Sequence, residues 1–183
     1  MTIAFARDVP LASRAPYYAQ KRTSLLKPGI RPLRFNHVAF RVSDLDRSLA
    51  FYEGVLGFRE AFRAERDGKV ALVYVQFGPD QFIELFPGGD EGRQPEPPDN
   101  GAGYRHFCLT VADLRATLAY LGTKGVPVGE PFVGTSGALI FFIDDPDGHK
   151  IELAEMNAQT TSRQAQARDR WLAEFPDEGW VPG

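Results

Sequence analysis

One sequence pattern occurs twice, 69 residues apart, and this internal repeat limits the possible folds more than any other feature. The stretch NHVAFRVSDL, which starts at Asn36, aligns with RHFCLTVADL, which starts at Arg105, so that His37 coincides with His106. Near the end of each copy an Ile-Glu-Leu tripeptide recurs at an offset of 68. A fixed internal period indicates that one supersecondary unit has been used twice. We therefore expect two modules with the same fold.

Local patterns in the first copy predict the order βαβββ. The alternating stretch from Phe35 to Val42 is typical of a strand. Ser43 or Asp44 is a suitable N-cap for a helix, because apolar residues recur at helical spacing from Leu45 onwards. The remaining strands are expected as a short one near 59–64 and two longer ones at 70–77 and 81–86.

The second copy predicts the same elements in the same order. A strand at 104–111 is followed by a helix capped by Asp113. Three strands are then expected near 131–133, 138–143 and 150–154. These patterns predict an α+β fold with an N-terminal arm (1–34), a first βαβββ module (35–88), a linker (89–103), a second βαβββ module (104–156), and a C-terminal helix and tail (157–183).

The two ends of the chain differ from the modules in composition. The arm holds seven Lys or Arg residues and only Asp8 as an acid, with four prolines that argue against a long helix. We expect it to dock on the body or on a partner subunit. The polar stretch 159–175 predicts a helix anchored by Trp171 and Phe175.

Composition excludes several classes of function. A net charge of −3 gives no indication of a nucleic-acid partner, and no apolar run approaches the roughly 20 residues of a membrane span. The single cysteine, Cys108, allows no intrachain disulfide and indicates a reducing compartment. The first residues lack the pattern of a secretory signal. We therefore expect a cytoplasmic protein.

Two histidines and two glutamates recur at equivalent places of the repeat. Residues two apart in a strand share a face, so His37 shares its face with Arg41, and His106 shares its face with Cys108. Considered without the repeat, a histidine on a strand is usually a hydrogen-bonded core residue. A glutamate in such a strand is usually an edge residue that faces water. Their duplication favours a common site, since a carboxylate between apolar neighbours is costly to bury unless it is paired or ligating. The predicted ligands of one divalent ion are His37, Glu84, His106 and Glu152.

The motifs HVAFRVSDLDRSLAFYEGVLGF and FIDDPDGHKIELAE resemble those of the vicinal oxygen chelate superfamily. This group includes glyoxalase I, methylmalonyl-CoA epimerase, extradiol dioxygenases, and bleomycin- and fosfomycin-resistance proteins. The resemblance covers roughly Phe35 to Met156. It implies a glyoxalase-like fold in which two βαβββ modules pair into a curled mixed sheet around the metal.

The His/Glu/His/Glu set is most similar to that of glyoxalase I. The resemblance therefore implies a metal-dependent lyase or isomerase acting on a hemithioacetal, or a related 2-oxo or hydroxy-carbonyl substrate, through a metal-stabilised enediolate. It implies Ni, Zn or Co as the ion, with Mn or Fe also compatible, and it makes Glu152 the first candidate for the proton-transferring base and Glu84 the second. Arg41 matches a family arginine that binds a substrate carboxylate.

Several alternatives remain open at this point. The chain departs from glyoxalase I at Gly88, where that family has an asparagine, and at Ala102, where it has an arginine, so glutathione itself is in question. Other readings are a methylmalonyl-CoA epimerase-like isomerase, an extradiol-type dioxygenase, and a non-catalytic binding protein for a small molecule such as an antibiotic. The resemblance implies a homodimer, and it leaves open whether the four ligands come from one chain or from two.

Overall fold

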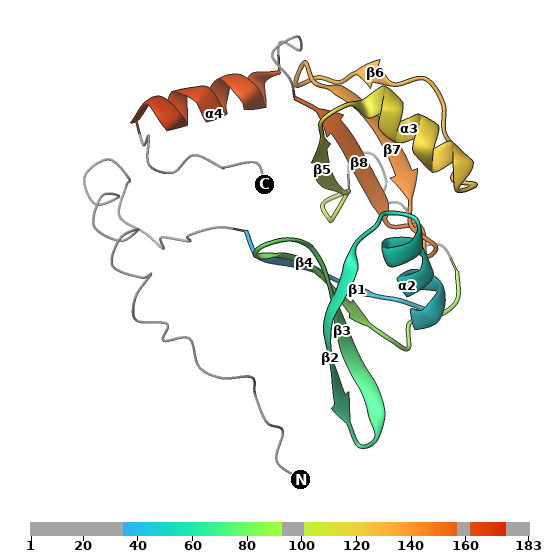
Figure 1. Cartoon of the computed structure of the whole chain (residues 1–183). Helices are drawn as coiled ribbons and strands as arrows, with labels where there is room; N and C mark the ends of the chain where they lie inside the picture. Colours follow the sequence, from blue (N-terminus) through green and yellow to red (C-terminus); the bar gives the residue numbers. More distant parts are fainter. Residues whose placement is uncertain (1–34, 93–100, 157–161, 175–183) are drawn as a thin grey trace. The chain divides into compact units, whose positions relative to one another are not determined.

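Each copy of the repeat folds as a βαβββ module in the computed structural model, which describes residues 35–92, 101–156 and 162–174 (Figure 1). All described helices and strands lie between residues 37 and 174. The arm predicted for 1–34 lies outside the described residues, as do 93–100 of the linker and Phe175 of the C-terminal segment. No helix of the described part is long and apolar enough to cross a membrane.

The first module forms a four-stranded sheet with one helix. Its strands lie in the order β1-β4-β3-β2, with β1 parallel to β4 and the other neighbours antiparallel. The elements are β1 (His37–Arg41), α2 (Leu45–Gly54), β2 (Arg59–Arg66), β3 (Lys69–Gly78) and β4 (Gln81–Phe86).

The second module repeats this topology in the strand order β5-β8-β7-β6, with β5 parallel to β8. Its elements are β5 (Phe107–Val111), α3 (Leu114–Thr123), β6 (Phe132–Val133), β7 (Leu139–Asp144) and β8 (Lys150–Glu155), and α4 (Arg163–Glu174) follows. The predicted α+β class with two βαβββ modules is confirmed.

An aspartate begins each module's helix in the same way. The carboxylate of Asp44 accepts a hydrogen bond from the backbone N–H of Arg47, and that of Asp113 accepts one from Ala116. Each bond satisfies a donor that the first helical turn leaves without an intrahelical partner. The two caps fix the turn from strand to helix that follows His37 in the first module and His106 in the second.

The modules differ most at their third element. The strand expected near 59–64 is an eight-residue strand, β2, whereas its counterpart β6 has two residues. Asp67 and Gly68 both have positive φ (54° and 72°), as a two-residue hairpin turn requires, so β2 and β3 continue as a long ribbon. In the second module Pro131, which precedes β6, cannot donate a hydrogen bond to a sheet.

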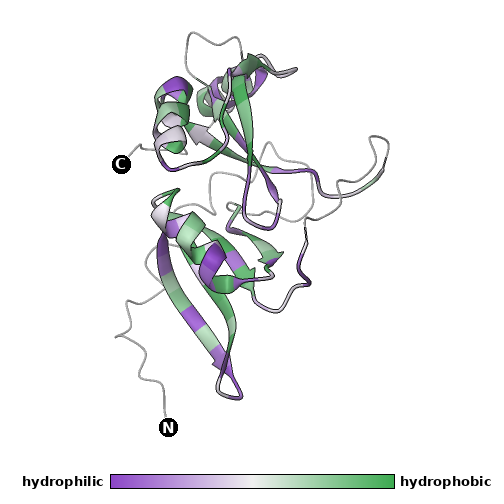
Figure 2. Ribbon diagram, turned by 90° about the vertical axis from the view of Figure 1, so that its right-hand side faces the viewer, coloured by the Kyte–Doolittle hydropathy of each residue, from purple (hydrophilic) through white to green (hydrophobic). Residues whose placement is uncertain are grey.

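Every second residue is buried in parts of β3, β4 and β8, and these buried faces contribute to a core that the two modules share. The largest fully buried side chains are Tyr52, Ile83, Leu85, Leu114, Leu121 and Ile151. They belong to one hydrophobic cluster that draws on both modules. In Figure 2 the hydrophobic colour follows the strands, and hydrophilic residues gather near the tip of the β2–β3 hairpin. Burial of this kind supplies most of the stabilisation of a small domain.

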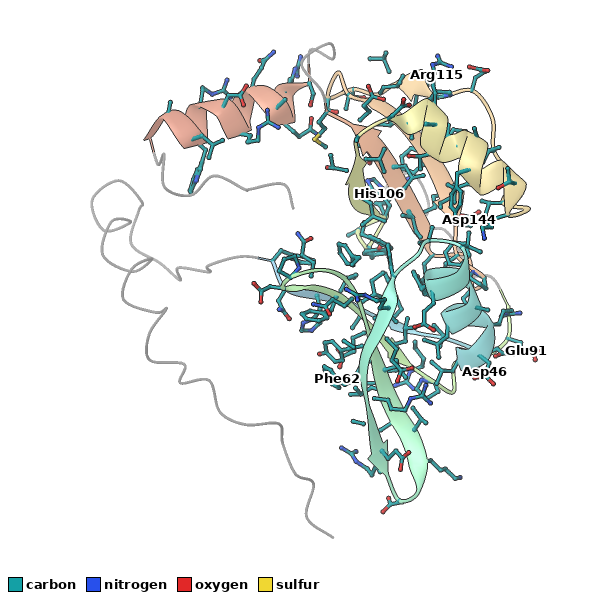
Figure 3. The ribbon with its side chains drawn as sticks, in the orientation of Figure 1. Asp46, Phe62, Glu91, His106, Arg115 and Asp144 are labelled. Carbon is teal, nitrogen blue, oxygen red and sulfur yellow. The ribbon has the colours of Figure 1, made fainter. Side chains whose placement is uncertain are left out.

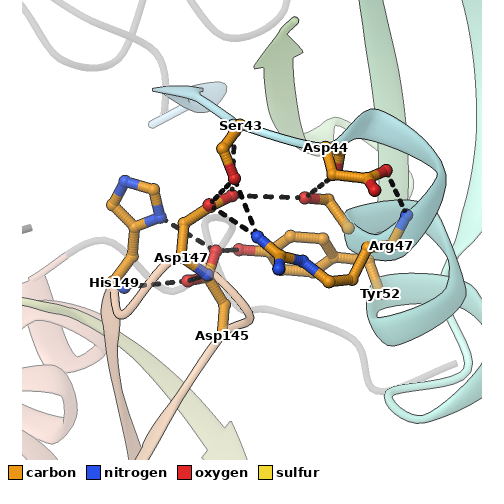
Figure 4. Close-up of polar contacts among 8 residues, drawn as sticks. Ser43, Asp44, Arg47, Tyr52, Asp145, Asp147 and His149 are labelled. Atoms are coloured by element: carbon orange, nitrogen blue, oxygen red, sulfur yellow. Dashed lines mark hydrogen bonds and ion pairs between the residues drawn. The ribbon is translucent and has the colours of Figure 1, made fainter. Parts of the chain in front are cut away.

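A buried polar network, which we call the joint, links α2 to the turn between β7 and β8 (Figure 4). Asp147 accepts hydrogen bonds from the N–H and hydroxyl of Ser43 and forms an ion pair with Arg47 at 3.1 Å. Asp145 accepts from the Tyr52 hydroxyl at 2.9 Å and contacts Nδ1 of His149 at 2.9 Å. Both carboxylates are 4% exposed, so their hydrogen bonds offset a large desolvation cost.

We expect the substitution Asp147→Ala to lower the free energy of unfolding by about 2–4 kcal/mol, because it leaves several polar partners without an acceptor. Urea unfolding measures this change. Asp46→Ala, an exposed first-turn position of α2, is the control and should change stability by less than about 1 kcal/mol. Equal stability of the two variants would contradict a structural role for the joint.

Candidate metal site

The first module brings His37 and Glu84 together on its parallel strand pair. Glu84 on β4 lies opposite Ala39 of β1, two residues after His37, so the imidazole and the carboxylate share a face. Nε2 of His37 lies 3.6 Å from Oε2 of Glu84. The imidazole is 40% exposed and the carboxylate 12%. We call this pair the first half-site.

The second module repeats the arrangement with His106 and Glu152, which we call the second half-site. His106 directly precedes β5, and Glu152 on β8 lies opposite Cys108. Nε2 of His106 lies 2.8 Å from Oε2 of Glu152, and the carboxylate is 13% exposed. Figure 3 labels His106 at the start of β5. The equivalence predicted from the repeat is therefore confirmed in three dimensions.

An aromatic residue lies beside each pair. Tyr74 on β3 is directly opposite Glu84, and Phe142 on β7 is directly opposite Glu152. Each ring meets its histidine edge to face, with centroids 5.6 Å apart for His37 and 5.3 Å for His106. These rings shield the carboxylates from water and so strengthen their electrostatic interactions.

The two carboxylates differ in their hydrogen-bond donors. The Tyr74 hydroxyl donates to Glu84; burial, this hydrogen bond and the carboxylate charge raise the pKa of the phenol. The thiol of Cys108 donates to Glu152, and burial of the thiol, followed by the charge of Glu152 and the hydrogen bond, raises its pKa to about 11. Both donors therefore keep their protons at neutral pH.

Sequence analysis alone missed Tyr74 and Phe142 as neighbours of the site. Gly78, Pro79 and Asp80 are typical turn residues, and counting back from them along β3 places Tyr74 near Glu84. The pairing of β3 with β4 is irregular between Gln76 and Gly78, however, so such a count is uncertain by a residue.

The four predicted ligands lie in two pairs rather than in one cluster. Among residues 35–92, 101–156 and 162–174, no group of three or more His, Cys, Asp or Glu side chains has the geometry to hold an ion. His149, which the sequence analysis did not assign to the site, belongs to the joint instead. A single chain thus presents two half-sites.

Arg41 lies on the face of β1 that carries His37, as predicted. Its guanidinium donates to the carbonyl of Pro87 at 3.1 Å and lies 5.8 Å from the centre of the Phe86 ring. These contacts hold the side chain across the end of β4, where the exposed guanidinium remains accessible to an anion.

Gly88 follows β4 with a φ of 82°. The left-handed region favours glycine, with asparagine the next most tolerant residue. The backbone thus explains a glycine at this position, and no side chain is available there to contact a substrate.

The donor set of the half-sites fits a divalent cation. Imidazole nitrogens and carboxylate oxygens are the ligands of zinc, nickel, cobalt, manganese and iron sites. Each imidazole Nε2 already faces its carboxylate, and both carboxylates are more than four-fifths buried. One half-site supplies two ligands, which is fewer than the three or four protein ligands usual for such ions.

Known structures share this fold. The crystal structure of the glyoxalase family protein from Enterococcus faecalis superposes with a TM-score of 0.57 and 27% identity, covering 67% of this chain and 97% of that one. The class defined by fold and site is thus that of paired βαβββ modules of the glyoxalase type.

Sequence comparison gives the family. The model of the Glyoxalase/Bleomycin resistance protein/Dioxygenase superfamily matches residues 34–153. The chain is 36% identical over 131 residues to the lactoylglutathione lyase of Salmonella typhimurium, covering 67% of this chain and 93% of that protein. It is 34% identical over 128 residues to the probable lactoylglutathione lyase, chloroplastic, of Arabidopsis thaliana, of which it spans 35%. The chain belongs to the glyoxalase/bleomycin resistance protein/dioxygenase superfamily.

Proposed function

We propose that this protein is a metal-dependent lyase or isomerase of the glyoxalase I type, acting on a hemithioacetal or a related hydroxy-carbonyl compound. The observation that carries the proposal is the duplicated His–Glu pair on one face of each sheet. Relatives named lactoylglutathione lyase at 34–36% identity support the same reaction class.

The complete site requires two chains in this proposal. Each half-site offers one imidazole and one carboxylate, and two half-sites together give the four predicted ligands. In a two-fold dimer, the first half-site of one protomer meets the second half-site of its partner, which creates two equivalent sites. The absence of a three-ligand group within the described part of one chain supports this arrangement.

The bound ion would act as a Lewis acid on two neighbouring substrate oxygens and stabilise the negative charge that develops on them. The residues that hold it are His37, Glu84, His106 and Glu152. Ni, Zn and Co are the proposed ions, and Mn and Fe are compatible with the same donors.

The chain's own groups perform the proton transfer. Glu152 takes a proton from the carbon that bears the substrate's hydroxyl and sulfur, and returns it to the adjacent carbon. The hydroxyl proton passes to the former carbonyl oxygen, so that substrate and product are isomers. The aromatic residues beside the half-sites exclude water from the carboxylate. Arg41, on the face of His37, is the proposed clamp for a substrate carboxylate.

Mixing two inactive variants tests the shared site. His37→Ala/Glu84→Ala lacks the first half-site, and His106→Ala/Glu152→Ala lacks the second. In a mixed dimer one site combines both defects and the other is intact, so random pairing should restore about a quarter of wild-type turnover. The measurement is hemithioacetal isomerisation after co-expression with Ni²⁺, with each variant alone as the control. No recovery in isolated mixed dimers would contradict a site shared between chains.

The substitution Glu152→Gln tests the assigned base. We expect kcat to fall at least about 100-fold, because proton transfer by a positioned carboxylate contributes that much or more. Fold and dimerisation should persist, as circular dichroism and gel filtration would report. Glu130→Gln, which changes an exposed carboxylate, is the control and should leave kcat unchanged. Undiminished turnover of Glu152→Gln would remove its role as the base.

A further inference from the structure

The four residues that end β4 and follow it, Phe86 to Gly89, are bound to the end of β1 beside the Arg41 side chain. The N–H of Val42 donates to the carbonyl of Phe86 at 2.8 Å, and the N–H of Gly89 donates to the carbonyl of Val42 at 2.9 Å. These two bonds extend the parallel pairing of β1 with β4 beyond its last paired residues, Arg41 and Phe86. The 86–89 segment therefore keeps a fixed position against Arg41.

Three groups of the 86–89 segment restrict the Arg41 side chain. The Pro87 carbonyl accepts a hydrogen bond from Nη1 of Arg41 at 3.1 Å, and the Phe86 ring lies under the guanidinium at 5.8 Å. A Cβ at position 89 would lie 3.3 Å from Cγ of Arg41 and 3.1 Å from the carbonyl carbon of Val42. A guanidinium has five N–H donors, so the bond to Pro87 leaves donors with which Arg41 can bind a carboxylate.

We propose that Gly89 is a positioning residue, which allows the 86–89 segment to hold the Arg41 guanidinium in the orientation that binds a substrate carboxylate. This inference rests on the proposed function, in which Arg41 is the clamp. A glycine permits the close approach of the two backbones, because a side chain at position 89 would push the segment away from β1 and Arg41. A guanidinium that is oriented beforehand loses less conformational freedom when it binds its ligand.

The second module lacks an equivalent clamp. Thr110 pairs with Ala154 in the register in which Arg41 pairs with Phe86, so that module has neither the guanidinium nor the ring. In the proposed dimer each site contains one first half-site and therefore one Arg41. A single clamp fixes the direction in which a carboxylate-bearing substrate binds.

Two substrates of the same shape test the positioning role. They are the hemithioacetals that methylglyoxal forms with 3-mercaptopropionate and with its uncharged amide. Gly89→Ala should raise KM for the carboxylate substrate about tenfold, because a small displacement of a binding group can cost that much or more. KM for the amide should change less than about twofold, and kcat should be retained with both.

Gly54→Ala is the matched control. A Cβ added at position 54, at the end of α2, would meet open space, so this variant should leave both KM values unchanged. Urea unfolding checks that Gly89→Ala is folded. Phe86→Leu tests the same segment without a change of the backbone, and should raise KM for the carboxylate substrate about threefold through loss of the ring under the guanidinium.

A double substitution separates positioning from a general structural effect. Arg41→Ala should remove the preference for the carboxylate over the amide. Adding Gly89→Ala to Arg41→Ala should then leave KM for the carboxylate substrate unchanged, because the two residues act through one interaction. A purely structural role of Gly89 would raise KM for both substrates, and would do so in the Arg41→Ala background as well.

The NMR signal of the Arg41 Nε–H reports binding without turnover. Titration with 3-(methylthio)propionate should shift this signal, and Gly89→Ala should require about tenfold more of the probe for half of the shift. An equal requirement in Gly89→Ala and the wild type would overturn the positioning role, and so would equal KM changes for the two substrates. A wild-type protein without isomerase activity would instead remove the proposed function, and the titration would still decide whether Gly89 positions Arg41.

Discussion

The parallel pairing of the first and last strands in each module is the constraint on which the site depends. It places Glu84 opposite Ala39 and Glu152 opposite Cys108, two residues beyond the site histidines. A shift of one residue in the pairing register would point either glutamate into the core and expose its neighbours. Ile83 and Ile151 beside them are fully buried, so the hydrophobic core itself enforces the register that joins acid to imidazole.

The internal repeat made most of the fold and of the candidate site predictable, because its signals are local. Strand alternation, the capping aspartates and the four site residues all occupy fixed positions in each copy, and the structure has them at equivalent places. The length of β2 was underestimated, although Asp67-Gly68 is a hairpin signal. The partners Tyr74 and Phe142 depend on cross-strand register, which no local pattern reports.

The joint shows where the two copies have diverged. The turn before β8 carries Asp145 and Asp147, which accept hydrogen bonds from Tyr52 and Ser43 of the first module. The corresponding turn before β4 is shorter and is held by the Gln76 amide, which donates to the carbonyls of Gly78 and Pro79. Both copies thus carry the His–Glu pair, whereas the carboxylates of the joint lie in the turn of the second copy.

In the proposed metal site, the pairing that shields the carboxylates would also couple ion binding to proton movement. In each half-site Nε2 of the histidine faces a carboxylate oxygen, which a neutral imidazole stabilises best by donating an Nε2–H hydrogen bond. A metal ligand must present a lone pair instead, so in the proposed site the proton would have to leave or move to Nδ1. The contact is closer in the second half-site, at 2.8 Å against 3.6 Å. His106 therefore contributes more to stabilising Glu152 than His37 does to Glu84, and in the proposed site ion binding would disturb the second half-site more than the first.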